Sequence, residues 1–364
     1  MKIALLIDSL HSVAAGSERQ IFKLAEGLTQ AGHQVHLYLL RHTQFTRTLT
    51  DFPCPISSLD IGRIASLSAL KRMAALRKQL IAEGVSVVHA YFPDACLLAP
   101  LTLKCPQIRI ITSRRDMGLI YQGKPAWLYS LLKGRTDKIV ANSQAVANHV
   151  SACEQLPAGK TAVIYNGIED FDFASSTAEP IYKHPDSIKV ILVANIKPVK
   201  RTLDAVMAVH MLKAARYPIE LVLAGEPQDT TYVEQIKDYI EAHKLTDNVH
   251  WLGQVAEPRR LLSQAHIGLL VSESEGLSNT IMEYMQAGLP VIATNVGGNP
   301  ELVRHEQNGL LIERGQVQQL ADAIFTLSNQ PDLICRYGEN GKERIQREFS
   351  LRALVVQHEA LYLA

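Results

Sequence analysis

Short, continuous apolar runs alternate with longer amphipathic segments along the whole chain. In the first half, such runs predict strands near residues 2–7, 34–40, 86–90, 108–112, 138–141 and 162–165. In the second half, they predict strands near 189–194, 219–224, 248–252, 267–271, 291–293 and 310–312. Strands that lack polar alternation are buried on both faces, so the pattern predicts parallel sheets covered by helices.

The chain begins in the same way twice. Residues 2–8 read as a strand followed by a polar loop and a helix near 17–31, and residues 189–195 start a second such unit with a helix near 201–215. The polar, irregular stretch 169–188 reads as a linker. We therefore expect an α/β protein with two doubly wound, Rossmann-like domains that face each other across a cleft.

The expected domain boundaries follow from this linker. Residues 1–170, completed by a C-terminal helix at about 348–364, form the first domain, and residues 171–347 form the second. In such folds ligands bind at the carboxyl ends of the strands. The candidate residues below lie at those ends.

Composition narrows the class of protein. The 364 residues are 47% hydrophobic and 20% charged, as in an ordinary globular protein. No apolar run approaches the ~20 residues of a membrane helix, and Asp8 ends the first run too early for a secretory signal. The five cysteines include no C-x-x-C pair, which indicates a reducing compartment and argues against zinc. We expect a cytoplasmic protein.

Charge is distributed unevenly. Residues 1–170 carry 19 Lys and Arg against 12 Asp and Glu, whereas the remainder carries 18 against 24. A basic N-terminal half fits an anionic partner or a membrane surface, and a chance scatter over solvated faces fits equally well.

One predicted helix, residues 66–83, is both basic and amphipathic. Its apolar side is expected to hold Leu67, Leu70, Met73, Ala74, Leu80 and Ile81. Much of the rest is covered by Lys71, Arg72, Arg77 and Lys78. An ordinary surface helix explains this pattern. The more specific alternative is a helix that makes peripheral contact with the inner face of a membrane.

The most informative local pattern is a pair of glutamates, Glu275 and Glu283, around a predicted helix start. Backbone amides at a helix N-terminus bind phosphates, and carboxylates accept hydrogen bonds from sugar hydroxyls. A structural alternative exists for Glu283, because Thr280 as N-cap would complete a capping box with it. Glu275, in a loop before Gly276, shows no comparable structural purpose.

The wider string from Ser274 to Glu301 closely resembles the donor-site signature of the retaining glycosyltransferases of the GT-B fold, family 4. Further segments match in register across essentially the whole chain. They are Ala15-Gly16-Ser17-Glu18-Arg19, Val140-Ala141-Asn142-Ser143, Tyr165-Asn166-Gly167-Ile168-Glu169 and the loop from Val193 to Lys200.

The resemblance implies a role for each matched residue. Glu283 would accept the ribose hydroxyls, Glu275 would face the donor sugar, and Lys200 would neutralise the departing diphosphate. Gly16 would let the backbone approach the same phosphate. The implied donor-binding residues are Glu283, Gly16, Asn195, Lys197, Gly276, Leu277, Ser278, Asn279, Thr280, Glu226 and Val255.

Three departures from the family pattern qualify these roles. Ala194-Asn195 stands where the family has Gly-Arg, with Lys197 as the expected substitute cation, and Ala15 replaces a glycine. Arg114 stands near the position where the family often has a histidine. It is therefore the third catalytic candidate, after Glu275 and Lys200, but the resemblance does not carry an acid–base role over to it.

Two further residues are candidates for the acceptor side. Arg115, with Arg114, would bind an anionic acceptor or leaving group; a surface pair with Asp116 is the alternative. His89 at a strand end would line the acceptor site, or simply be a hydrogen-bonded polar cap.

Asp170-Phe171-Asp172 spells the D-x-D motif that binds metals in other glycosyltransferases, but it falls in the linker. We therefore expect no metal and no cofactor.

The resemblance then implies transfer of a sugar from a nucleoside diphosphate, most simply UDP, to a hydroxyl acceptor in bacterial cell-surface polysaccharide or lipid-linked glycan synthesis. The alternatives are a GDP-sugar-dependent transferase, a nucleotide-sugar epimerase and a non-catalytic sugar-binding protein. No nucleic-acid partner is expected.

Overall fold

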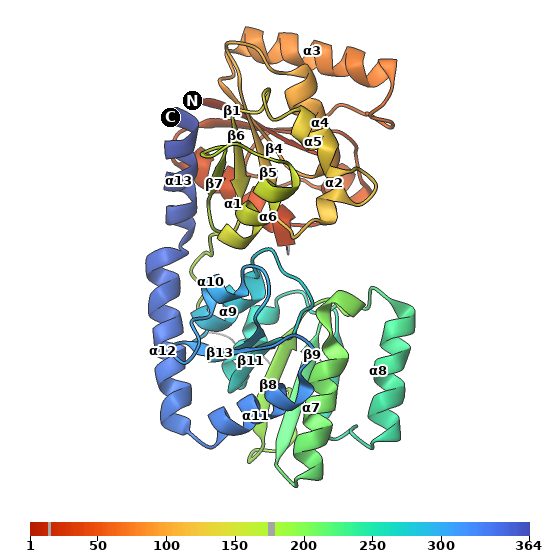
Figure 1. Ribbon diagram of the computed structural model, residues 1–364, viewed down its shortest axis with the longest axis vertical. Helices are drawn as coiled ribbons and strands as arrows, with labels where there is room; N and C mark the ends of the chain where they lie inside the picture. The colour runs from red at the N-terminus through yellow and green to blue at the C-terminus, as the bar shows by residue number, and fades with distance from the viewer. Residues whose placement is uncertain (14–15, 174–178) are drawn as a thin grey trace. The chain divides into compact units, whose positions relative to one another are not determined.

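The computed structural model describes residues 1–13, 16–173 and 179–364 (Figure 1). Contacts divide the chain into two units, Met1–Gly167 with Leu351–Ala364, and Ile168–Ser350. The division thus falls three residues from each boundary expected above. Ala15, one of the departures from the family pattern, lies outside the described residues.

The N-terminal unit is a seven-stranded parallel sheet in the order β3-β2-β1-β4-β5-β6-β7. Its strands are β1 (Lys2–Ile7), β2 (Gln34–Leu39), β3 (Ile56–Ser58), β4 (Val87–Ala90), β5 (Arg109–Arg114), β6 (Lys138–Ala141) and β7 (Thr161–Val163). Its helices are α1 (Gly16–Gln30), α2 (Gln44–Thr48), α3 (Leu67–Glu83), α4 (Pro93–Thr102), η1 (Leu119–Tyr121), α5 (Ala126–Leu131), α6 (Gln144–Cys153) and α13 (Leu351–Leu363).

The C-terminal unit is a six-stranded parallel sheet in the order β10-β9-β8-β11-β12-β13. Its strands are β8 (Ile188–Val193), β9 (Ile219–Ala224), β10 (Val249–Gly253), β11 (Ile267–Leu270), β12 (Val291–Thr294) and β13 (Gly309–Ile312). Its helices are η2 (Pro198–Lys200), α7 (Thr202–Ala214), α8 (Thr230–Ala242), η3 (Pro258–Gln264), α9 (Asn279–Gln286), α10 (Asn299–Leu302), α11 (Val317–Ser328) and α12 (Pro331–Glu348).

The last helix, α13, completes the N-terminal unit, as expected. It packs on α1, where a Cβ at Gly27 would lie 2.3 Å from the Val355 side chain. The His33 Nε2 and the Glu359 Oε1 add a hydrogen bond at 2.7 Å. The sheet face beneath them carries Leu5, Leu37 and other apolar side chains in one core cluster.

Each predicted strand is present, with ends displaced by no more than two residues. The fold class is therefore confirmed: both units are parallel, Rossmann-like sheets covered by helices. β3, at the sheet edge, was not predicted, because Ile56-Ser57-Ser58 contains a single apolar residue.

Candidate active site

The sheet order of the C-terminal unit places the candidate donor residues together. β8 and β11 are adjacent, and the strand order reverses between them. The loops that leave these two strands hold Lys197 and Lys200 on one side and Glu275 on the other. Crevices at such reversals are the usual ligand sites of doubly wound sheets.

Lys200 and Glu275, predicted separately, form an ion pair. The Lys200 Nζ lies 2.6 Å from the Glu275 Oε1, and both side chains are mostly buried. The Ser272 hydroxyl donates to the same oxygen at 2.6 Å. The expectation that Glu275 has no structural role is therefore wrong, because its carboxylate joins the two loops.

Two glycines permit the close approach of the loops. A Cβ at Gly297, whose φ is +51°, would lie 1.7 Å from the carbonyl oxygen of Glu275. A Cβ at Gly225 would lie 1.8 Å from the carbonyl oxygen of Ala194. No side chain fits at either position without displacing the backbone of a candidate loop.

Helix α9 begins beside Glu275. Ser278 is its N-cap, and the Ser278 side chain accepts a hydrogen bond from the Ile281 amide. The predicted capping box with Thr280 as N-cap is therefore wrong, since Thr280 already lies in the first turn. Leu277 and Ser278 are buried, and Glu283 is 8% exposed on the same helix.

The loop between β8 and η2 presents the second lysine. Lys197 is half-buried at the N-cap of η2, and Asn195 is exposed. Burial, followed by repulsion from Lys200, lowers the pKa of the Lys197 ammonium. A phosphate close to both lysines would relieve this repulsion.

The remaining donor candidates lie at the same edge of the sheet. Glu226 follows β9 and is exposed, and its carbonyl accepts from the Ile196 amide at 2.8 Å. Val255, just after β10, is half-buried. Gly276 and Asn279 flank the buried pair at the start of α9.

In the N-terminal unit, the corresponding reversal lies between β1 and β4. Gly16 starts α1 with φ +66°, which a residue with a side chain rarely adopts. Glu18 accepts the amides of His11 at 2.7 Å and Ser12 at 3.1 Å, so it holds residues 11 and 12 close to the first turn of the helix.

Arg115 ties the first turn of α1 to a second matched segment. Its Nε donates to the Ser17 hydroxyl at 3.2 Å, and its Nη2 donates to the Asn166 side chain. Asp116 instead accepts the amides of Gly118 and Ile120. Arg115 therefore stabilises the start of α1. The sequence did not predict this structural role, because the partners of Arg115 are distant in the chain.

Asp8 is another group that sequence reasoning treated only as the end of a strand. Its carboxylate accepts the amides of Asp94 at 3.0 Å and Ala95 at 2.7 Å at the start of α4. Burial raises its pKa to about 6, against the effect of these donors. A titratable carboxyl thus lies at the N-terminal reversal.

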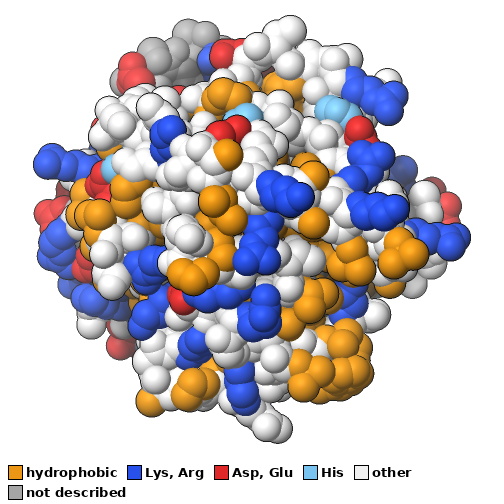
Figure 2. Space-filling model, turned by 90° about the horizontal axis from the view of Figure 1, so that it is seen from above, with side chains coloured by type: hydrophobic (Ala, Val, Ile, Leu, Met, Phe, Trp, Pro, Cys, Tyr) orange, Lys and Arg blue, Asp and Glu red, His pale blue; other side chains and the backbone are white. Residues whose placement is uncertain are grey.

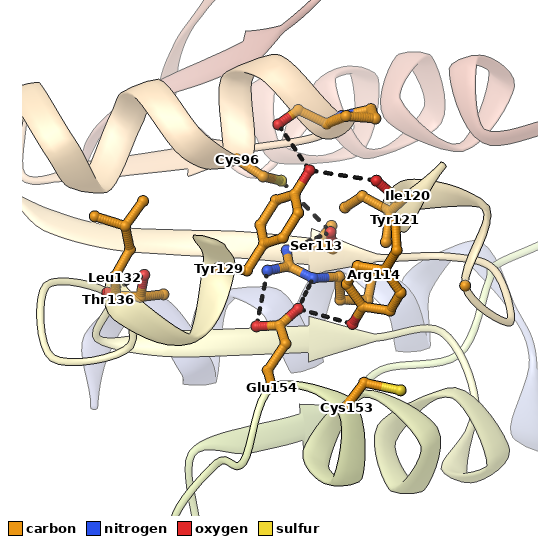
Figure 3. Close-up of polar contacts among 12 residues, drawn as sticks. Cys96, Ser113, Arg114, Ile120, Tyr121, Tyr129, Leu132, Thr136, Cys153 and Glu154 are labelled. Carbon is orange, nitrogen blue, oxygen red and sulfur yellow. Dashed lines mark hydrogen bonds and ion pairs between the residues drawn. The ribbon is translucent and has the colours of Figure 1, made fainter. Parts of the chain in front are cut away.

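Arg114 is engaged within the N-terminal unit (Figure 3). Its Nε and Nη2 donate to Glu154 at 2.7 and 3.1 Å, and its guanidinium lies 4.9 Å from the centroid of the Tyr129 ring. Both charged side chains are at most 3% exposed. Burial opposes the charge, but attraction to Cys96 and Glu154 raises the pKa of Arg114. This geometry contradicts a catalytic assignment, because the cation is already buried against its partner.

His89 is fully buried, so the hypothesis that it lines an acceptor site is wrong. Its Nδ1 lies 2.7 Å from the Tyr362 hydroxyl, and its Nε2 lies 2.8 Å from the Ser113 hydroxyl. Burial, with smaller effects of His358 and Arg115, lowers the pKa of His89 well below its usual value. The side chain joins β4 to α13 as a neutral polar contact.

Among residues 1–13, 16–173 and 179–364, no group of three or more His, Cys, Asp or Glu side chains is arranged to hold a metal ion. In the D-x-D segment, Phe171 packs against Phe173 and under the Arg259 guanidinium, 4.3 Å from the ring centroid.

Two parallel-sheet units of this kind, with a lysine–glutamate pair and a capped helix at a sheet reversal, are the arrangement expected from the resemblance to GT-B glycosyltransferases. The family model described as "Glycosyl transferases group 1" matches residues 177–344, and "Glycosyltransferase Family 4" matches residues 14–170. The chain belongs to this family of glycosyltransferases.

Two curated relatives and one solved structure illustrate what the chain is similar to. N-acetyl-alpha-D-glucosaminyl L-malate synthase of Bacillus anthracis is 25% identical over 379 residues, covering 100% of this chain and 97% of that protein. The capsular polysaccharide biosynthesis glycosyltransferase CapM of Staphylococcus aureus is 24% identical, covering 83% and 82%. The crystal structure of Anabaena Alr3699/HepE in complex with UDP shares the fold, with TM-score 0.84, 21% identity and full coverage of both chains.

Proposed function

We propose that this glycosyltransferase transfers a hexose or N-acetylhexosamine from a UDP-sugar to a hydroxyl acceptor, with retention of configuration. The meeting of Lys200, Glu275 and the start of α9 at the reversal between β8 and β11 carries the proposal. Lysine and helix amides suit a diphosphate, and a carboxylate suits sugar hydroxyls.

The nucleotide and the sugar are supported by relatives. The Anabaena structure contains UDP, and the name of the Bacillus anthracis relative specifies an N-acetylglucosaminyl group. A GDP-sugar remains the alternative donor. CapM points to a polysaccharide setting, and a polysaccharide or lipid-linked acceptor at the cytoplasmic side of a membrane fits the proposal.

The proposed chemistry follows from where the charges lie. The bond between the sugar and the diphosphate breaks as the acceptor oxygen attacks from the same face, and the leaving phosphate oxygen takes the acceptor proton. Lys200 stabilises the charge that develops on the diphosphate. Glu275, held by Lys200 and Ser272, is better suited to orienting the sugar than to attacking it. We propose that no metal is needed, so a chelator should leave the rate unchanged.

Activity assays test the assignment. A thermal-shift screen with UDP-, GDP- and ADP-sugars identifies the donor, and product analysis then follows the transferred sugar. Lys200→Ala and Glu275→Ala should each lower kcat by about 10²–10³-fold in a folded protein, the loss typical of removing one such electrostatic group. Lys342→Ala, at an exposed lysine of the same unit, is the matched control.

The same assay separates the alternatives. An epimerase would convert a labelled UDP-sugar without acceptor, and a binding protein would release no UDP when acceptor is added. Near-normal transfer by either active-site variant would contradict the assignment.

A further inference from the structure

The helices on one face of the N-terminal sheet form a single layer. The inner sides of α3, α4, η1 and α5 share one core cluster, to which Met73, Leu98, Ile120 and Tyr129 contribute. Their outer sides therefore face away from that sheet together.

This outer side carries large apolar side chains. Its exposed members are Leu67, Leu70, Ile81, Leu101, Leu119, Trp127 and Leu131. Leu67, Leu70 and Ile81 were expected on the packed side of α3, but that side is formed by Ala69, Met73, Leu76 and Leu80. The helix thus has apolar residues on both its inner and its outer side.

Positive charge is concentrated in the same segment. Residues 61–135 contain 12 Lys and Arg but only 3 Asp and Glu, whereas the rest of the chain contains 25 and 33. Of the three acids, Asp94 is buried and paired with Arg41. Arg109 and Arg114 belong to β5 and Arg115 directly follows it, so nine of the twelve cations lie on or beside the helices of this layer.

Basic and apolar side chains are interspersed on this surface. On α3, the exposed Lys71, Arg72 and Lys78 lie among the exposed apolar residues. Beside Leu101, the Arg135 side chain donates to the carbonyl of Pro100 at 2.7 Å. Figure 2 shows a face on which Lys and Arg side chains alternate with hydrophobic ones, with few acidic side chains between them.

We propose that this basic apolar face, formed by the outer sides of α3, α4, η1 and α5, docks onto a bilayer that contains anionic phospholipids. The leucines and Trp127 enter the boundary between headgroups and acyl chains, and the lysines and arginines meet the lipid phosphates. Tryptophan is favoured at that depth. Among the described residues, no helix is long and apolar enough to cross a membrane.

An anionic bilayer fits this face better than an anionic polymer does. A polyanion would be bound by the cations alone, and it gives no reason for a leucine that is 72% exposed at position 131 or a tryptophan that is 59% exposed at position 127. Large apolar side chains exposed in this number on one helical layer fit an interaction surface.

Vesicle binding by the full chain tests the proposal, without donor or acceptor, so its outcome is independent of the transferase assay. Phosphatidylcholine vesicles with and without phosphatidylglycerol are sedimented at low and high salt. Leu131→Gln should weaken binding about tenfold. Leu363→Gln, at a leucine that is also 72% exposed, should leave binding unchanged. Lys71→Gln with Lys78→Gln should weaken it about twenty-fivefold, at roughly fivefold per cation.

Tryptophan fluorescence provides a second measurement. The chain has two tryptophans, so Trp251→Phe leaves Trp127 as the sole reporter. Its emission should shift to the blue with anionic vesicles and not with neutral ones. Equal binding to both vesicles, or none, would overturn the proposal. So would binding that high salt abolishes while Leu131→Gln and the Trp127 emission show no change, which would indicate a polyanion instead.

Discussion

Replacing Glu154 with alanine should destabilise the N-terminal unit far more than replacing both members of its ion pair. Glu154→Ala leaves the Arg114 guanidinium, 3% exposed, without its carboxylate partner. Removing one member of a buried pair costs about 3–5 kcal/mol. For a unit of this size each kcal/mol lowers the melting temperature by about 2–4 °C, so we expect a fall of about 6–20 °C.

The double variant Arg114→Met with Glu154→Leu should recover most of that loss. Apolar side chains of similar volume fill the same space, and such replacements are often neutral or stabilising. The half-buried Tyr121 hydroxyl, which donates to Glu154 at 2.9 Å, can turn to water. Differential scanning calorimetry of the full chain measures both effects. Glu26→Ala, which removes a partly exposed pair with Lys23, is the control and should cost under about 1 kcal/mol.

The same variants decide what Arg114 does. If it is structural, the folded double variant keeps its transferase activity. A double variant that melts normally but has lost activity would show that Arg114 acts in the reaction, against our interpretation. A Glu154→Ala protein as stable as the parent would contradict the energetic argument.

Three further predictions rest on contacts described above. Gly297→Ala should lower kcat/KM by about 10²-fold by displacing the Glu275 carbonyl, whereas Gly62→Ala, where a Cβ meets no atom within 4 Å, should not. Arg115→Met should increase hydrogen exchange at the start of α1, measured by mass spectrometry; unchanged exchange would show that its bond to Ser17 is dispensable. The buried Glu220 accepts the amides of Lys183 and His184 at 2.7 and 2.9 Å, and although burial opposes its charge, these and other donors lower its pKa to about 2 from 4.5. Its stabilisation is complete above pH 4.5 and is lost as pH falls toward 2, so calorimetry should show a decline of about 3 kcal/mol that Glu220→Gln lacks.

All strands except β3 could be predicted because each is a local apolar run. The candidate loops could be placed for a related reason, since they directly follow those strands. Family resemblance then identified Lys200 and Glu275, but their mutual contact depends on β8 and β11 becoming neighbours, which local sequence does not specify.

Other errors share one cause. Arg114 and His89 were treated as available because both are polar and lie at strand ends. Their partners, Glu154 and Tyr362, are 40 and 273 residues away, so burial and pairing could not be inferred from neighbouring residues. The apolar side of α3 was assigned incorrectly because leucines occur on both sides of the helix.

The placement of α13 has a consequence for synthesis of the protein. Residues 1–167 leave the ribosome long before residues 351–364, which complete the same unit. Until then, Gly27 lacks the Val355 side chain that packs against it, and His89 lacks the Tyr362 hydroxyl. The N-terminal unit is therefore completed only after the entire C-terminal unit has been translated. During that time α13 does not yet cover the apolar surface of α1.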